Sequence, residues 1–420
     1  MLSGAQNERQ QAGNLCLVLF ERIDYTDGEF FVLFGSVLEE NFVKITCKQQ
    51  DLNRGLSAVS HAVSGRSTLP ILANILLATD HGRLKLSATN LEIGINCWVD
   101  AEIGEEGTTT VPAKLITDFV NSLPQGSVEI SVSPDSHVMN VKGMRSNANI
   151  KGMDAAEFPQ IPSNEGGEQP VLLDALLLKE MIAEVAFAAA DDDSRPVLTS
   201  VLVQVSDENI TFAAADAFRM AMRSADLPGG ENPRGDILIP ARTLTELARI
   251  LPAEGPVEMI VTPNRSQVLF HTATVDLVSR LIEGTFPNVR GVIPKESTTR
   301  AVAETKEFAA AVKSAALFAR DSSNIARVKI NPGGADGSVG AITIEATAED
   351  LGDSVNTVNA AVDGPELEII FNVKYLSEVL NSIGTPEVAL EASSANKPGV
   401  IKPVGPGDCT YVIMPMHVNR

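Results

Sequence analysis

Basic residues recur at one place in three amphipathic segments of this chain. Each opens the polar face of a predicted helix, and the residues are Lys114 in 112–123, Arg242 in 240–251 and Lys374 in 372–383. Lysine and arginine on such a face make sequence-independent contacts with phosphates, which exchange readily and permit sliding along a polyanion. The same pattern is also typical of solvated helix faces with i,i+4 charge pairs. The spacing therefore indicates phosphate contact without excluding an ordinary surface.

Further basic residues extend this pattern. Lys306, Lys313 and Arg320 are spaced by seven and lie on one face of the predicted helix 306–320, and Arg249 is a second outward residue of the helix that begins near Pro240. The whole chain has 33 basic and 54 acidic residues. Its net charge of −21 disfavours non-specific binding to nucleic acid or anionic membranes. Any contact with DNA must therefore be local to these helix faces.

Residues that could support catalysis or hold a metal ion form no convincing arrangement. The acidic run 191–193 could bind Mg²⁺ in principle, but it follows an alanine-rich segment and is typical of a solvated helix exit. The five histidines have no metal-ligand spacing with one another or with the four cysteines. Neither a Gly-x-Ser-x-Gly elbow nor a phosphate-binding glycine loop is present. We therefore expect a protein that is not an enzyme, with no catalytic residues, metal or cofactor.

The helices that carry these residues belong to an internal repeat. Segments 112–124 and 240–252 share five of thirteen residues, and a looser third copy covers 371–383. A repeat of this size suggests a curved or closed assembly more readily than a single active site.

Length and repeat agree on the domain organisation. A chain of 420 residues favours roughly three domains, which we place at 41–165, 168–294 and 298–420. Segment 1–40 stands outside the repeats and lacks the features of a signal peptide, so it is either a loosely attached extension or an artefact of an upstream start assignment. No apolar run has the length of a membrane span, and the scattered cysteines fit a reducing cytoplasm.

Hydrophobic periodicity predicts an α+β fold in which each domain has two helices and antiparallel sheets. The predicted helices are 50–63, 112–123, 178–190, 240–251, 306–320 and 372–383. The strands predicted in the first domain are 42–47, 71–79, 83–89, 93–101, 108–111, 128–132, 138–141 and 148–151. In the third domain, 341–346 is predicted as a hairpin strand.

Six stretches of the chain resemble the bacterial DNA polymerase III beta subunit family, the DNA sliding clamps. They are 64–72 (SGRSTLPIL), 109–113 (TTVPA), 156–159 (AEFP), 215–221 (ADAFRMA), 371–375 (FNVKY) and 411–416 (YVIMPM). The likeness covers residues 41–420 in order and with family-like spacing. The first and last stretches are specific, whereas TTVPA alone would be weak.

This resemblance implies the DNA clamp fold, with helices lining the interior of a ring. The ring would be a head-to-tail homodimer that encloses double-stranded DNA without reading its sequence. It would tether the replicative polymerase through the DNA polymerase III alpha subunit, and would also meet a clamp-loader complex and other replication and repair proteins. A repeat scaffold that binds only proteins is the alternative.

The resemblance also implies site residues. The expected DNA-facing set combines family positions with the basic helix faces: Arg66, Lys114, Arg195, Arg242, Arg249, Lys306, Lys313 and Lys374. The expected partner-peptide pocket lies between the second and third domains: Leu198, Ala215, Ala217, Phe218, Arg219, Met220, Pro294, Tyr375, Val412, Met414, Pro415 and Met416. Leu317 and Phe318 are the expected dimer contacts. The family often has tyrosines after the second arginine, where this chain has Pro196 and Val197, and it commonly has threonine and glycine at the places of Ala215 and Ala217.

Overall fold

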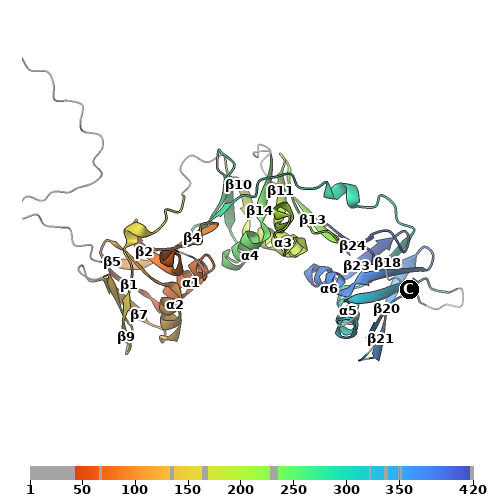
Figure 1. The fold of residues 1–420 in the computed structure, drawn as a ribbon, viewed down its shortest axis with the longest axis horizontal. Helices are drawn as coiled ribbons and strands as arrows, with labels where there is room; N and C mark the ends of the chain where they lie inside the picture. Colours follow the sequence, from red (N-terminus) through yellow and green to blue (C-terminus); the bar gives the residue numbers. More distant parts are fainter. Residues whose placement is uncertain are drawn as a thin grey trace, which may run out of the picture.

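The computed structural model describes residues 43–65, 69–132, 137–162, 169–227, 235–320, 323–334, 339–348, 350 and 352–416. These residues form an arch of three domains (Figure 1), and each domain contributes two of the six α-helices that the described chain contains. The helices lie on the concave side of the arch and the sheets on its convex side. No helix in the described ranges is long and apolar enough to cross a membrane.

The first domain pairs helix α1 (Gln49–Ser60) with helix α2 (Ala113–Ser122). Its strands are β1 (Val43–Lys48), β2 (Asn74–Asp80), β3 (Arg83–Thr89), β4 (Ile93–Val99), β5 (Ala101–Glu105), β6 (Thr108–Pro112), β7 (Ser127–Val132), β8 (Val138–Lys142) and β9 (Asn147–Lys151). The strand expected at 71–79 begins later, because Pro70 opens a 3₁₀ turn, η1 (Pro70–Ala73), before β2. A second such turn, η2 (Ala155–Glu157), follows β9.

The second domain has helices α3 (Ala175–Val185) and α4 (Ala241–Ile250). Its strands are β10 (Val171–Asp174), β11 (Ser200–Val205), β12 (Asn209–Ala215), β13 (Arg219–Asp226), β14 (Gly235–Pro240), β15 (Pro256–Val261), β16 (Gln267–His271) and β17 (Val275–Arg280). The 3₁₀ turns are η3 (Ala186–Ala188), η4 (Pro196–Thr199) and η5 (Val289–Val292), the last in the connection to the third domain.

The third domain has helices α5 (Thr305–Ala319) and α6 (Val373–Ser382). Its strands are β18 (Thr299–Glu304), β19 (Ile325–Asn331), β20 (Ala341–Ala348), β21 (Gly352–Asp363), β22 (Leu367–Asn372), β23 (Glu387–Ala392), β24 (Gly399–Val404) and β25 (Asp408–Ile413). Strand β20 was predicted at 341–346, whereas β21 was not predicted. Half of the residues of strand β21 are polar and only two of its residues are buried, so it lacks the apolar signal of a buried strand.

Local sequence explains where the helices begin. Pro112 and Pro240 directly precede α2 and α4, where the missing N–H of proline leaves no intrahelical bond unmade. The Asp174 carboxylate accepts hydrogen bonds from the N–H groups of Leu176 and Leu177, which caps α3. The predicted start at 178 was wrong because this cap lies ahead of the apolar stripe. The predicted end at 190 was also wrong, because the α-helix ends at Val185 and continues only as η3.

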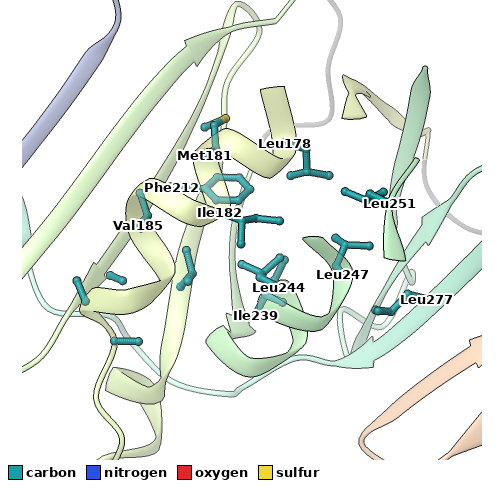
Figure 2. Close-up of a cluster of buried hydrophobic side chains, with 14 of the residues drawn as sticks. Leu178, Met181, Ile182, Val185, Phe212, Ile239, Leu244, Leu247, Leu251 and Leu277 are labelled. Atoms are coloured by element: carbon teal, nitrogen blue, oxygen red, sulfur yellow. The ribbon is translucent and has the colours of Figure 1, made fainter. Parts of the chain in front are cut away.

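Buried apolar side chains join each helix pair to its sheets. In the second domain, Leu178 and Ile182 of α3 face Leu244 and Leu247 of α4, with Phe212 of β12 beside them (Figure 2). All five are at most 3% exposed. Burial of each such side chain contributes about 1.5–3 kcal/mol relative to exposure.

The sheets continue across both domain boundaries. Strand β4 of the first domain pairs with β17 of the second, and β13 of the second pairs with β25 of the third, both antiparallel. The strand orders are β5-β1-β7-β8-β9, β10-β15-β16-β17-β4-β3-β2-β6 and β14-β11-β12-β13-β25-β24-β23-β18-β21-β20-β19-β22. Neighbouring domains therefore share backbone hydrogen bonds, which fixes their relative orientation on the arch.

Candidate DNA-facing surface and partner surface

The three repeated basic residues lie at matching places on the concave face. Lys114, Arg242 and Lys374 are each the second residue of the second helix in their domain, and all three are exposed. Lys114 and Arg242 make no ion pair with any described residue, and Lys374 lies 3.9 Å from Glu378. Their charges are therefore available to a polyanion inside the arch.

The other predicted DNA-facing residues differ in how free their charges are. Lys306 and Lys313 are exposed on α5, and Arg195 is exposed just before η4. Arg249 donates to both carboxylate oxygens of Glu246 at 2.9 Å, so its charge is partly neutralised. Arg66 lies outside the described residues.

An open cleft of about 1320 Å³ in the second domain is lined by residues of α3, η3, η4, α4 and the end of β17. Arg242, Arg249 and Arg280 contribute to its lining, with Asp191 and Asp193 among its acidic residues. Arg280 was not predicted from the sequence, because it ends strand β17 and so lies outside the basic helix faces. Its position next to two helix arginines in the cleft is a tertiary feature without a local signal.

The acidic run has a local structural role. Asp192 accepts hydrogen bonds from the backbone N–H and the hydroxyl of Ser194, both at 2.8 Å. These bonds lower the pKa of the Asp192 carboxyl. Among the described residues no group of three or more histidine, cysteine, aspartate or glutamate side chains is placed to hold a metal ion.

An apolar surface lies on the convex side where the second and third domains meet. Its buried floor consists of Leu202, Ala213, Ala215, Met220, Met222, Leu238, Val289, Val400 and Val412. The side chains of Val197, Ile282, Phe286 and Ile293 pack against this floor. Close to floor residues in sequence, Phe218 is 57% exposed, Val292 46% and Met414 37%. We call these three residues and their floor the boundary patch. Large apolar side chains grouped on a folded surface mark binding sites more often than isolated ones do.

Backbone contacts hold the rim of the boundary patch. The N–H of Met414 donates to the carbonyl of Phe218 at 2.8 Å, which ties the end of the chain to the second domain. The N–H of Met416 donates to the carbonyl of Ile370 at 2.8 Å. Residues 414–416 therefore cross from one domain to the other along this surface.

The structure distributes the predicted pocket residues over several places. Ala215, Met220 and Val412 lie in the floor of the boundary patch, and Phe218 and Met414 at its rim. Leu198 is buried in η4, Ala217 is exposed beside Phe218, and Pro415 and Met416 are half-buried. Pro294 lines a separate cavity of about 70 Å³. Val289, Val292 and Val400, which the sequence analysis missed, come from the domain connection and from β24.

Arg219 and Tyr375 belong to a clamp behind the boundary patch. Successive strand residues point to opposite faces, so Arg219 points toward the helices while Met220 points outward. The Arg219 guanidinium pairs with the Asp216 and Glu378 carboxylates and donates to the Phe187 carbonyl at 2.7 Å.

Two aromatic rings flank this guanidinium. Its carbon lies 4.5 Å from the Tyr375 ring centroid and 5.4 Å from that of Phe187. Burial raises the pKa of Tyr375, and the nearby Asp216 charge adds to the effect. With a side chain only 6% exposed, Arg219 joins the two domains and does not face the convex surface.

Equivalent residues at the first boundary have a different character. The N–H of Arg280 donates to the carbonyl of Glu92 at 3.0 Å, which matches the bond between Met414 and Phe218. Glu92 and Arg280 thus occupy the places that Phe218 and Met414 occupy in the rim of the boundary patch. Ile161 of the domain connection covers Gly94, where an added Cβ would lie 2.8 Å from the isoleucine.

The expected dimer contacts lie near the end of α5. Leu317 is 72% exposed, whereas Phe318 is partly buried against the core. Leu115 of α2, at the other end of the arch, is 52% exposed. Both ends of the arch therefore present apolar side chains on their helices.

The arch of three helix-pair domains, with basic helix faces inside and continuous sheets outside, defines a clamp-type protein. Models of the N-terminal, central and C-terminal domains of the DNA polymerase III beta subunit match residues 43–162, 173–288 and 290–417. The beta sliding clamp of Synechocystis is 31% identical over 396 residues, covering 90% of this chain and 100% of that protein. The beta sliding clamp of Bacillus subtilis is 28% identical and covers 89% of this chain and 100% of its own length.

Solved structures agree. The crystal structure of the Bacillus subtilis DNA polymerase sliding clamp has a TM-score of 0.82 at 28% identity, covering 90% of this chain and all of that chain. That of the Thermotoga maritima DNA polymerase III beta subunit has a TM-score of 0.81 at 26% identity with the same coverage. The chain therefore belongs to the DNA polymerase III beta subunit family, the beta sliding clamps.

Proposed function

We propose that this protein is a DNA sliding clamp, which joins with a second copy head to tail, encloses duplex DNA and tethers the replicative polymerase. The observation that carries the proposal is the repeated exposed basic residue that opens each second helix on the concave face, Lys114, Arg242 and Lys374. Phosphate contacts of this kind are independent of sequence and exchange quickly.

Charge distribution supports retention by enclosure. The net charge of −21 makes DNA avoid the rest of the surface, while a few basic side chains guide it inside the arch. Few phosphate contacts give low affinity, and low affinity favours sliding. Retention would then depend on the closed ring.

Strand pairing supports the way the ring closes. At the two internal boundaries β4 pairs with β17 and β13 pairs with β25. The matching strands at the ends of the arch are β21 and β9. Over residues 352–359, β21 pairs with β20 alone among the described strands, and β9 pairs only with β8 and so ends its sheet. Pairing of β21 with β9 of a second copy would repeat the internal boundaries and leave neither edge open.

The boundary patch is the proposed docking surface for partner peptides. Exposed phenylalanine and methionine over an apolar floor suit an extended peptide with large apolar side chains. Phe218, Met414 and Val292 would contact it directly. The DNA polymerase III alpha subunit, the clamp loader and other replication and repair proteins would share this surface in the bacterial cytoplasm.

Processive synthesis tests the proposal. Extension of a primed circular template is measured with the polymerase, the clamp loader and this protein, with a trap that allows one binding event. We expect the protein to lengthen the products greatly. The variant Lys114→Glu/Arg242→Glu/Lys374→Glu should lose most of the gain, and Asp207→Lys on the β11–β12 turn should keep it. Products of unchanged length with the native protein would instead support a protein-binding scaffold.

A further inference from the structure

The internal repeat pairs the end of each first helix with the second helix of the following domain. The first residues of α1, α3 and α5 are structurally equivalent, because the N–H groups of Gln49, Ala175 and Thr305 donate to the carbonyls of Gly126, Gly255 and Pro386, which precede matching strands. Counting from these residues, the equivalent positions at the helix ends are His61, Phe187 and Leu317. The equivalent acidic positions of α2, α4 and α6 are Asp118, Glu246 and Glu378.

Both internal boundaries use these positions. At the first, Nδ1 of His61 lies 2.7 Å from a carboxylate oxygen of Glu246. At the second, the Phe187 ring and the Glu378 carboxylate both contact Arg219. In each case the carboxylate of the following domain meets a nitrogen-bearing side chain of the preceding one.

Within the described residues, α5 lies in the last domain and α2 in the first, so neither meets such a partner in the same chain. The end of α5 exposes Leu317, which has Arg320 one turn along the same face. Helix α2 exposes Leu115, with Asp118 one turn along its own face. Neither Arg320 nor Asp118 makes a hydrogen bond through its side chain, or an ion pair, with any described residue. The two ends are complementary, since each offers a leucine and the charges have opposite sign.

We propose that the seam between two copies is closed by an ion pair from Asp118 of one protomer to Arg320 of the other, beside packed Leu115 and Leu317. This rests on the head-to-tail ring proposed above and adds the residues that make its seam. Unlike the internal boundaries, the seam has no chain connection. Its ion pair therefore adds to the strand pairing and the packed leucines in holding the ring closed, and it makes closure sensitive to salt.

Charge exchange tests the seam. The dimer dissociation constant is measured by sedimentation at low salt for the native protein, Asp118→Arg, Arg320→Asp and the double variant. Each single reversal puts like charges together and should raise the dissociation constant at least about tenfold. The double variant should recover most of the loss, because it restores opposite charges with the order reversed. Glu307→Arg, an acidic-to-basic change near the start of α5, should leave the native value.

The outcomes separate this proposal from the one on which it rests. If the native protein sediments as a monomer, the ring itself is wrong. If the native protein is a dimer, two results would rule out the ion pair without ruling out the ring. Either the single reversals have no effect, or the double variant is weakened by as much as the two single variants together. Circular dichroism of each variant confirms that it is folded.

Discussion

The two internal domain boundaries share a backbone frame and differ in the side chains placed on it. Both pair antiparallel strands, and both have a hydrogen bond from the end of the second strand to the turn before the first. The rim is Glu92 and Arg280 at the first boundary and Phe218 and Met414 at the second. A triplicated fold therefore provides similar surfaces twice, and the rim residues explain why one of them is suited to apolar peptides.

The side-chain contacts on the helix side of the two boundaries, which we call their clamps, differ as well. Arg219 is buried and carries a permanent charge between two carboxylates and two aromatic rings. The His61 side chain is 33% exposed and pairs with one carboxylate, Glu246. Buried side-chain contacts thus hold the second boundary behind the proposed docking surface, while the first relies more on strand pairing and on Ile161.

The largest expected effect is the loss of the Arg219 clamp. Arg219→Ala leaves Asp216 and Glu378 without their buried partner and should lower the free energy of unfolding by about 3 kcal/mol. Urea unfolding followed by circular dichroism measures it. The free energy of unfolding of Arg219→Lys should lie between those of the native protein and Arg219→Ala, because lysine keeps the charge but lacks the planar, forked guanidinium. A loss below about 1 kcal/mol for the alanine variant would mean that the clamp does not hold this boundary.

The second-largest effect is expected when the apolar rim of the second boundary is replaced by the charged rim of the first. Phe218→Glu combined with Met414→Arg reproduces the rim of the first boundary and should weaken binding of a polymerase peptide about 100-fold, as expected when two central apolar contacts are lost. Fluorescence anisotropy with a labelled peptide measures the affinity. Glu92→Gln combined with Arg280→Gln is the matched control at the other boundary and should bind normally. Equal affinity for all three proteins would remove the boundary patch as the docking surface.

A smaller effect is expected for the apolar cover of the first boundary. Ile161→Ala opens a space above Gly94 and should cost about 2 kcal/mol. Trp98, the chain's one tryptophan, donates its backbone N–H to Thr274 across this boundary at 2.9 Å, so its fluorescence reports unfolding there. Val289→Ala, the equivalent change at the second boundary, should leave the fluorescence transition nearly unchanged. The reverse ranking would contradict the separate roles of the two connections.

The smallest effect is expected at His61. His61→Ala removes a half-exposed pair and should cost about 0.5 kcal/mol, an effect that decreases as salt is added. Urea unfolding at two salt concentrations gives this value. A loss as large as that of Arg219→Ala would show that the two clamps are equivalent after all.

The sequence predicted features with a local signal and missed those that depend on distant contacts. Helices α2, α4 and α6 were predicted almost to the residue, because proline or asparagine precedes a regular apolar stripe. Strand β21 was missed because half of its residues are polar and only two of its residues are buried. The outward and inward directions of Met220 and Arg219 follow from strand alternation, yet the burial of Arg219 depends on Glu378, which is 159 residues away in sequence.

The charge pattern on the concave face was likewise visible in the sequence, since each basic residue has a fixed place in its repeat. Arg280 was not, because only the fold brings the end of β17 beside α4. Residue roles that come from the repeat can therefore be predicted, whereas those that come from packing between repeats cannot.

Retention on DNA tests enclosure most directly. The protein is assembled on closed circular DNA, freed of unbound protein at high salt, and the DNA is then cut once. We expect the protein to stay bound to the intact circle and to be released by the cut, because its weak phosphate contacts cannot hold it once an end is available. Equal retention on circular and cut DNA, or rapid loss from both, would contradict enclosure.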